Sequence, residues 1–310
     1  MEKVQALRQS GLARRLFLAT RPMFFPASAV PVAVGTAWGV TGGDAFAPGL
    51  FALALAGMFA LHAGANVLND VSDELNGCDR ANDDRIGPFT GGSRFLQDDI
   101  LSLPVMAVWG CSLLTLAALA GVGLIAAKGV TVLVLGVIGA ALALAYSLRP
   151  VALASRGLGE LAVAIAFGLP VGACAWLQAG ELSASATLAA VAVAAWTAAI
   201  LVANEVPDRK ADGRAGKRTL VVRLGLAATR RLYLGIHAAG AAAVAALVPV
   251  AGLPAWALVP AFALLAAAAD AARHLTERRD DQLRAIRATL ALHLAGGVWL
   301  TVAALIPPGQ

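Results

Sequence analysis

The feature that most constrains the fold is a series of long apolar segments. Nine of them run at roughly 22–42, 47–69, 101–126, 129–147, 158–179, 184–204, 231–251, 253–273 and 285–306. A helix of about 20 apolar residues is long enough to cross the hydrocarbon core of a bilayer. Only 14% of the chain is charged, whereas soluble domains are nearer to about 25%. The sequence therefore predicts an all-α integral membrane protein with nine transmembrane helices.

The basic residues indicate an orientation. If the N-terminus is cytoplasmic, every one of the 24 Lys and Arg residues except Lys128 falls on the cytoplasmic side. This asymmetry follows the positive-inside rule. We therefore expect a multi-pass protein of the cell (inner) membrane, with its N-terminus inside and its C-terminus outside. The net charge of +5 belongs to loops beside an anionic leaflet, so nucleic-acid binding is not expected.

Two long polar loops, 70–100 and 205–230, follow the second and sixth apolar segments. This layout predicts two four-helix modules and one appended helix, with both loops at the same face of the bundle. No linker divides the chain, so residues 21–306 are predicted to form one membrane domain. Residues 1–20 place basic side chains among Leu and Phe, which favours an amphipathic arm on the inner leaflet.

Each polar loop begins with a cluster of amides and carboxylates. The first contains Asn69, Asp70 and Asp73, and the second contains Asn204, Asp208 and Asp212. Residues four apart share a helix face, so each cluster presents a stripe of oxygen ligands. Oxygen ligands without softer donors suit Mg²⁺, which completes its shell with water and substrate phosphate. Carboxylates beside hydrocarbon seldom persist without partner charges or a task.

The same loops supply basic side chains that suit phosphate oxygens. They are Arg85, Arg94, Arg209, Lys210, Arg214, Lys217 and Arg218. A diphosphate could thus be held by metal ions and by cations at once. Ordinary loop solvation is the plainer interpretation of the acids. A cation transporter is a further alternative, but its acidic pairs would lie near the bilayer midplane rather than at the ends of spans.

Taken together, the motifs of the two polar loops resemble those of a known family. Asn69-Asp70-x-x-Asp73 is followed by Gly77-x-Asp79, and Asp208-x-x-x-Asp212 by Gly216-Lys217-Arg218-Thr219-Leu220. In this order, and with nine predicted spans, they resemble the UbiA superfamily of intramembrane prenyltransferases. The resemblance runs from about Arg21-Pro22 to the ninth segment. Within the superfamily the chain is most similar to the 1,4-dihydroxy-2-naphthoate polyprenyltransferases of menaquinone biosynthesis.

The resemblance implies an activity and a set of roles. A polyprenyl group would pass from a polyprenyl diphosphate to an aromatic acceptor. Asn69, Asp73, Asp208 and Asp212 would direct two Mg²⁺ ions at the diphosphate, with Asp70 and Asp79 in support. Contacts to the substrates are implied for a further group, namely Lys217, Arg218, Arg85, Arg21, Asn204, Tyr146 and Ser147.

The chain departs from the family pattern in two places. The stretch from Asp79 to Arg85 is longer than usual, which leaves Asp83 and Asp84 as alternatives for one motif position. Glu205 and Pro207 replace the Asn and Arg often seen before Asp208. Hydroxybenzoate, a chlorophyll precursor or another lipid therefore stay open as acceptors, as does cyclisation of the prenyl diphosphate. Prenyl chain length and oligomeric state do not follow from the sequence.

His62 lies inside the second apolar segment. We expect it to have a hydrogen-bonded packing role, with a proton relay as the alternative. Glu160 opens the fifth segment, where a carboxylate is favourable to the helix dipole, and a capping role is expected for it. The three cysteines are far apart and indicate neither a disulfide nor a zinc site.

Overall fold

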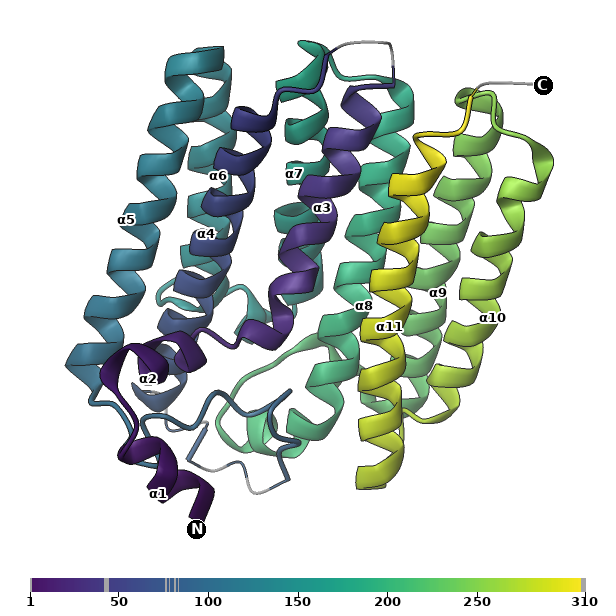
Figure 1. Ribbon diagram of the computed structural model, residues 1–310. Coiled ribbons are helices and arrows are strands. Elements are labelled where there is room, and N and C mark those ends of the chain that lie inside the picture. Colours follow the sequence, from purple (N-terminus) through teal and green to yellow (C-terminus); the bar gives the residue numbers. More distant parts are fainter. Residues whose placement is uncertain are drawn as a thin grey trace.

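A computed structural model describes residues 2–41, 45–75, 77, 79–80, 82 and 84–307. All regular structure in this part of the chain is helical, and the long helices stand side by side as a bundle (Figure 1). The long helices are α3 (Phe25–Gly39), α4 (Pro48–Leu75), α5 (Leu103–Lys128), α6 (Val130–Ser147), α7 (Gly159–Ala179), α8 (Ala184–Arg214), α9 (Leu220–Val250), α10 (Val259–Arg273) and α11 (Arg279–Ala303). The short helices are α1 (Glu2–Arg8), α2 (Leu12–Ala19), η1 (Pro22–Phe24), η2 (Ala154–Arg156) and η3 (Ala255–Leu258).

The predicted membrane spans are confirmed, with one qualification at the first. Eight of the described helices are long and apolar enough to cross a bilayer. A ninth crossing exists when α2 and the η1–α3 segment are taken together as one span bent by 44°. The chain is thus a multi-pass membrane protein. Its described ends lie at opposite ends of the bundle (Figure 1), as an odd number of crossings requires.

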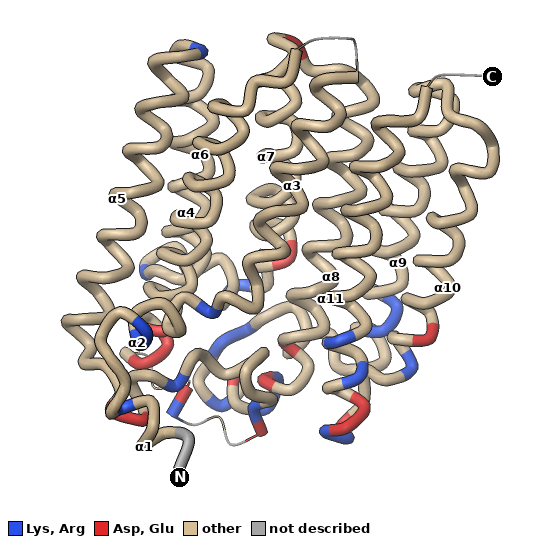
Figure 2. Tube along the Cα trace, in the orientation of Figure 1, with Lys and Arg blue, Asp and Glu red and all other residues tan. Residues whose placement is uncertain are grey.

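Charged residues gather at the end of the bundle that carries α1 and α2 (Figure 2). A short basic segment at the other end lies where α5 finishes, at Lys128 (Figure 2). The second helix of each predicted module, α4 and α8, continues beyond its apolar stretch into the charged end. Both acidic motifs consequently lie on regular helix, not in the loops that follow.

Glycines bring the helices together. A Cβ atom on Gly35 of α3 would lie 2.2 Å from the carbonyl oxygen of Val171 on α7. Cβ atoms on Gly240 of α9 and Gly296 of α11 would lie 2.8 Å and 2.4 Å from the ring of Trp196 on α8. Small residues that let helices approach closely are the usual contact of helices in lipid. These contacts join α3 to α7 and hold α8 between α9 and α11.

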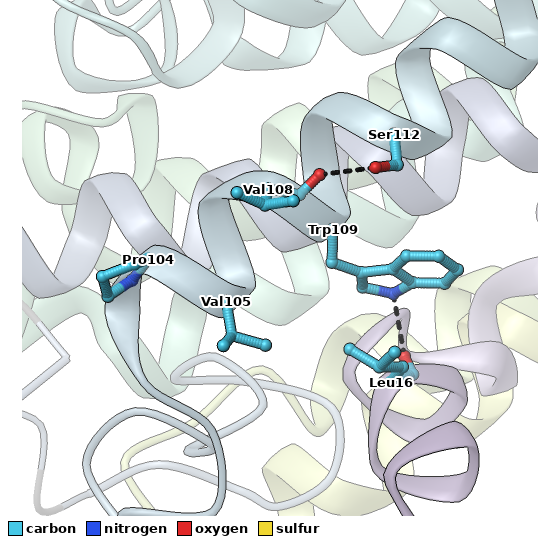
Figure 3. A pocket seen from close by; sticks show the side chains of 6 residues that line it. All are labelled: Leu16, Pro104, Val105, Val108, Trp109 and Ser112. Atoms are coloured by element: carbon cyan, nitrogen blue, oxygen red, sulfur yellow. Dashed lines mark hydrogen bonds between the residues drawn. The ribbon is translucent and has the colours of Figure 1, made fainter.

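The N-terminal arm packs on the start of α5 and on the loop before it. The Arg8 guanidinium donates to the carbonyl oxygen of Asp98, and Trp109 Nε1 donates to the carbonyl oxygen of Leu16 over 3.0 Å (Figure 3). On its outer side α2 exposes Leu12 and Phe17. Figure 3 shows the side chains that line a hollow between α2 and α5, namely Leu16, Pro104, Val105, Val108, Trp109 and Ser112.

Candidate active site

The first acidic motif occupies the last turns of α4. Asp70 is almost fully buried, and its carboxylate lies 2.5 Å from the Arg21 guanidinium. The backbone N–H of Ser93 donates to the other Asp70 oxygen over 3.0 Å. The Asn69 amide donates to the Ser147 hydroxyl at the end of α6 over 2.8 Å. The motif is thus tied to the start of α3, to the 77–101 loop and to α6.

The second motif occupies the last turns of α8. Asp208 receives a hydrogen bond of 2.7 Å from the Asn82 amide and one of 3.1 Å from the backbone N–H of Gly91. Both donors belong to the loop that follows the first motif. The loop therefore crosses to α8 and joins the two motifs, which confirms that both polar loops meet at one face of the bundle.

Lys217 links the two motifs directly. Its ammonium group lies 2.7 Å from Asp73 Oδ1 and 3.7 Å from Asp212 Oδ1. All three side chains are largely withdrawn from solvent. Carboxylates near a helix C-terminus oppose the helix dipole, so a cation between them removes an unfavourable interaction. The arrangement places an amine where negative charge from both helices converges.

Asp79 stands between the motifs in the loop. One of its carboxylate oxygens, Oδ2, is buried and has no hydrogen-bond partner among the described residues. Burial, together with the negative charges of Asp73 and Asp70, raises the pKa of Asp79 to about 7. Gly92 packs against this carboxylate, because a Cβ atom on Gly92 would lie 2.2 Å from Oδ2. The backbone φ of Gly92 is +70°, a conformation that favours glycine.

Tyr146 and Ser147 close the site on the α6 side. Ser147 accepts the hydrogen bond from Asn69, and its carbonyl oxygen accepts one of 3.1 Å from the Ser72 hydroxyl. Tyr146 lies within reach of the charges of Glu205 and Lys217. Ser147, for which the family resemblance implies a substrate contact, thus lies against the first motif, with Tyr146 beside it in the chain.

Other predicted site residues lie less centrally. The Arg218 side chain is exposed, and no ion pair joins it to the acidic motifs among the described residues. Arg85 is partly buried in the loop beside Arg94, and its pKa is lowered by burial first and then by the Arg94 charge. Asn204 has a buried side-chain oxygen without a partner. Of the two alternatives in the longer stretch, Asp84 is exposed and Asp83 lies outside the described residues.

Sequence reasoning missed several contributors. Asn82 and Ser93 hold Asp208 and Asp70, but a polar loop residue carries no distinguishing pattern. Glu160, expected to cap α7, is buried, and neither of its carboxylate oxygens makes a hydrogen bond of standard geometry within the described part of the chain. Its carboxyl group faces that of Glu205 on α8. The sequence signal for this difference was Glu205, which stands where the family often has Asn.

The residues present fit a divalent cation that prefers oxygen ligands. The unpartnered oxygens of Asp79 and Asn204 are buried, and such atoms require a donor or a cation. No set of three or more His, Cys, Asp or Glu side chains already converges on one point in the described part of the chain. Arg21 and Lys217 instead pair with carboxylates of the first motif. A metal ion bound here would displace Arg21 and Lys217 from these carboxylates or share the carboxylates with them.

The fold and these motifs define a multi-pass membrane protein with a polar, charge-rich site at one end of its bundle. Residues 28–300 match the UbiA prenyltransferase family, and the chain belongs to that family. It is therefore a membrane prenyltransferase.

Characterised relatives agree with this assignment. The chain is 37% identical to the 1,4-dihydroxy-2-naphthoate octaprenyltransferase of Mycobacterium tuberculosis, over 70% of this chain and 72% of the relative. It is 32% identical to the Escherichia coli enzyme of the same name, over 69% of each chain. The 2-carboxy-1,4-naphthoquinone phytyltransferase of Synechocystis is 31% identical, over 68% of this chain and 67% of the relative.

Solved structures share the fold. A UbiA homologue from Aeropyrum pernix superimposes with a TM-score of 0.67 at 19% identity, covering 90% of this chain and 96% of the other. A homologue from Archaeoglobus fulgidus, bound to DMAPP and Mg²⁺, gives a TM-score of 0.64 at 16% identity, covering 93% and 99%. These similarities confirm the UbiA-type bundle predicted from the sequence.

Proposed function

We propose that the chain transfers a polyprenyl group from a polyprenyl diphosphate to the aromatic ring of 1,4-dihydroxy-2-naphthoate. The observation that carries this proposal is the meeting of two acidic helix ends around Lys217. A diphosphate is the kind of ligand that needs carboxylate-bound metal on one side and an amine on the other. Three of the relatives described above act, by their names, on naphthoate or naphthoquinone acceptors.

Mg²⁺ is the proposed cofactor, with two ions expected. The residues that would hold them share oxygen side chains at the ends of α4 and α8 or in the loop between, and they are Asn69, Asp70, Asp73, Asp79, Asp208 and Asp212. When bound, the ions would neutralise the charge that develops on the departing diphosphate. The Mg²⁺ bound to the Archaeoglobus fulgidus homologue supports the choice of metal.

The chain's own cations would assist the leaving group. As the bond between the allylic carbon and the diphosphate oxygen breaks, the electron pair leaves with the diphosphate. We expect Lys217 to stabilise that charge, because its ammonium group lies between Asp73 and Asp212. Arg21 and Arg85 would bind the outer oxygens. The electron-rich ring carbon that bears the carboxylate then attacks the allylic cation, which the apolar spans shield from water. The carboxylate leaves as CO₂, and the electron pair of its broken bond restores the aromatic ring.

The proposal includes an orientation in the membrane. The charged end of the bundle would face the cytoplasm of a cell with the protein in its inner membrane, and the N-terminus would be inside. The asymmetric distribution of Lys and Arg (Figure 2) supports this orientation. The active site would then open toward the compartment where charged, water-soluble substrates are found.

A reconstituted assay tests the function. The purified protein in liposomes with Mg²⁺ is given geranyl diphosphate and, in parallel reactions, 1,4-dihydroxy-2-naphthoate, 4-hydroxybenzoate or no acceptor, and lipids are identified by mass spectrometry. Prenylated naphthalenediol in the first reaction alone is expected. Product only with hydroxybenzoate would show a different acceptor. Cyclised hydrocarbon without acceptor would show a cyclase and contradict the proposal.

A further inference from the structure

The four histidines of the chain differ in the hydrogen bonding and burial of their ring nitrogens. His293 Nε2 is hydrogen-bonded to Thr197 over 3.0 Å. His237 Nε2 has no partner but is sealed off by surrounding atoms. His274 lies at the charged end, 3.5 Å from Asp281. His62 alone combines a position inside a span with a ring nitrogen, Nε2, that is neither bonded nor enclosed in the described structure.

The ring of His62 is held firmly from two sides. Its Nδ1 atom lies 2.6 Å from the Ser28 hydroxyl on α3. Its ring stands edge-to-face with Phe167 on α7, with centroids 5.2 Å apart and planes at 84°. Because α4 contacts both of these helices through His62, the ring points into the bundle and is fixed in orientation.

The Ser28 contact also sets the tautomer. The Ser28 hydroxyl can donate to Nδ1 over this 2.6 Å contact. We take this tautomer as part of the inference, and in it the remaining ring proton lies on Nε2. An N–H donor without a partner is costly at membrane depth. His62 therefore presents a donor that needs an oxygen atom from elsewhere.

The position of His62 on α4 indicates which molecule could supply that oxygen atom. His62 and Asn69 are seven residues apart and share one helix face, on which Asn66 and Asp73 also lie. The separation of His62 from Asn69 along the helix is about 10 Å. The charge of Arg21, the partner of Asp70, acts on the His62 ring. The Nε2–H group thus lies about two helical turns along α4 from the proposed metal-binding residues. It is on the membrane side of the space where the allylic carbon would be bound.

We infer that His62 is a specificity-determining residue that donates a hydrogen bond from Nε2 to an oxygen substituent of the aromatic acceptor. The inference rests on the proposed function, because it places the acceptor ring between His62 and the diphosphate. Ser28 then acts as a positioning residue that fixes the tautomer. The polar stripe of α4 would hold the donor substrate at its cytoplasmic end and the acceptor one to two turns deeper.

Three variants of His62 separate this role from packing. His62→Phe keeps the ring against Phe167 but removes the donor, and it should raise the KM for acceptor about tenfold or more. The KM for prenyl diphosphate should stay within about twofold. His62→Gln carries an amide N–H at nearly the reach of Nε2 and should restore most of the affinity. His62→Asn, whose amide is too short, should not.

His237→Phe is the matched control, since that ring is equally internal but its Nε2 is sealed, and it should change neither KM. An unchanged acceptor KM in His62→Phe would overturn the inference. Equal rises in both KM values would do so as well, and so would a Gln variant no better than Asn. If His62→Phe does not accumulate, the Gln and Asn pair still decides the outcome. Wild-type protein that prenylates no aromatic acceptor would instead contradict the proposed function, and that result is obtained before any variant is compared.

Discussion

The ammonium group of Lys217 lies 2.7 Å from the Asp73 carboxylate, although the two residues come from opposite halves of the chain. The pair joins the loop after α8 to the end of α4. Since Asp212 is 3.7 Å from the same nitrogen, the amine balances negative charge from both motifs. If Mg²⁺ and a diphosphate bind as proposed, Asp73 would pair with the metal and Lys217 would be able to contact phosphate.

We expect Lys217→Gln to raise the KM for prenyl diphosphate and to lower kcat, with a combined loss in kcat/KM of about 10- to 100-fold. A charge-assisted contact to the leaving group is lost in both the ground and transition states. Lys210→Gln is the matched control, because Lys210 is 58% exposed and pairs with Glu277 on the surface. If both variants have wild-type kinetics, Lys217 serves membrane topology and not the site.

Asp73→Ala and Asp208→Ala should each lower turnover by at least about 10²- to 10³-fold. Each removes a carboxylate that would bind the metal ion, and the metal would neutralise the charge on the departing diphosphate. Asp270→Ala, at an exposed position on α10, should be fully active. Purified yield and thermal unfolding measured beside activity separate loss of chemistry from loss of fold. Near-normal turnover in both motif variants would contradict the metal and diphosphate assignment.

Chelation should abolish activity reversibly. Mg²⁺ is bound through few carboxylates and through substrate phosphates, so EDTA should remove it and added Mg²⁺ should restore turnover. Ca²⁺ should restore little, because it is larger and adopts looser geometry. A binding assay with labelled geranyl diphosphate should show the same metal dependence without catalysis. Full turnover in excess EDTA would be incompatible with this prediction.

Gly92→Ala should reduce activity more than its effect on backbone strain explains. The new methyl group would lie 2.2 Å from Asp79 Oδ2 and 3.2 Å from Asp70 Oδ1. The left-handed backbone adds a strain of about 1 kcal/mol. Gly180→Ala has the same strain, with φ +79° and open space around it, and it lies away from the site. Equal activity in the two variants, at equal thermal stability, would show that the contact with Asp79 is unimportant.

Much of the bundle could be predicted from hydropathy because apolar length alone decides whether a helix can cross a bilayer. Helix ends were harder to predict. The sixth span was expected to end near 204, yet α8 continues to Arg214. The seventh was expected to start near 231, yet α9 begins at Leu220 with Thr219 as its cap and is kinked at Gly225, where φ is 68°. Hydropathy indicates where an apolar stretch ends, and these helices continue beyond their apolar stretches.

The motif residues themselves were predictable because their spacing matches one helix face. The contacts that orient them were not. Asn82 and Gly91 reach Asp208 across more than a hundred residues of sequence, and the Glu160 and Glu205 carboxyl groups meet between two helices. Such pairings depend on how the loop folds over the bundle, which local patterns do not determine.

The break between α2 and α3 has a mechanical consequence. Arg21 occupies this break with a left-handed φ of 56° and reaches Asp70 from it. The same break joins the first acidic motif to α2, which exposes Leu12 and Phe17. A displacement of α2 would therefore move the counter-charge of Asp70, so the position of the N-terminal arm and the charge balance at the first acidic motif are mechanically linked.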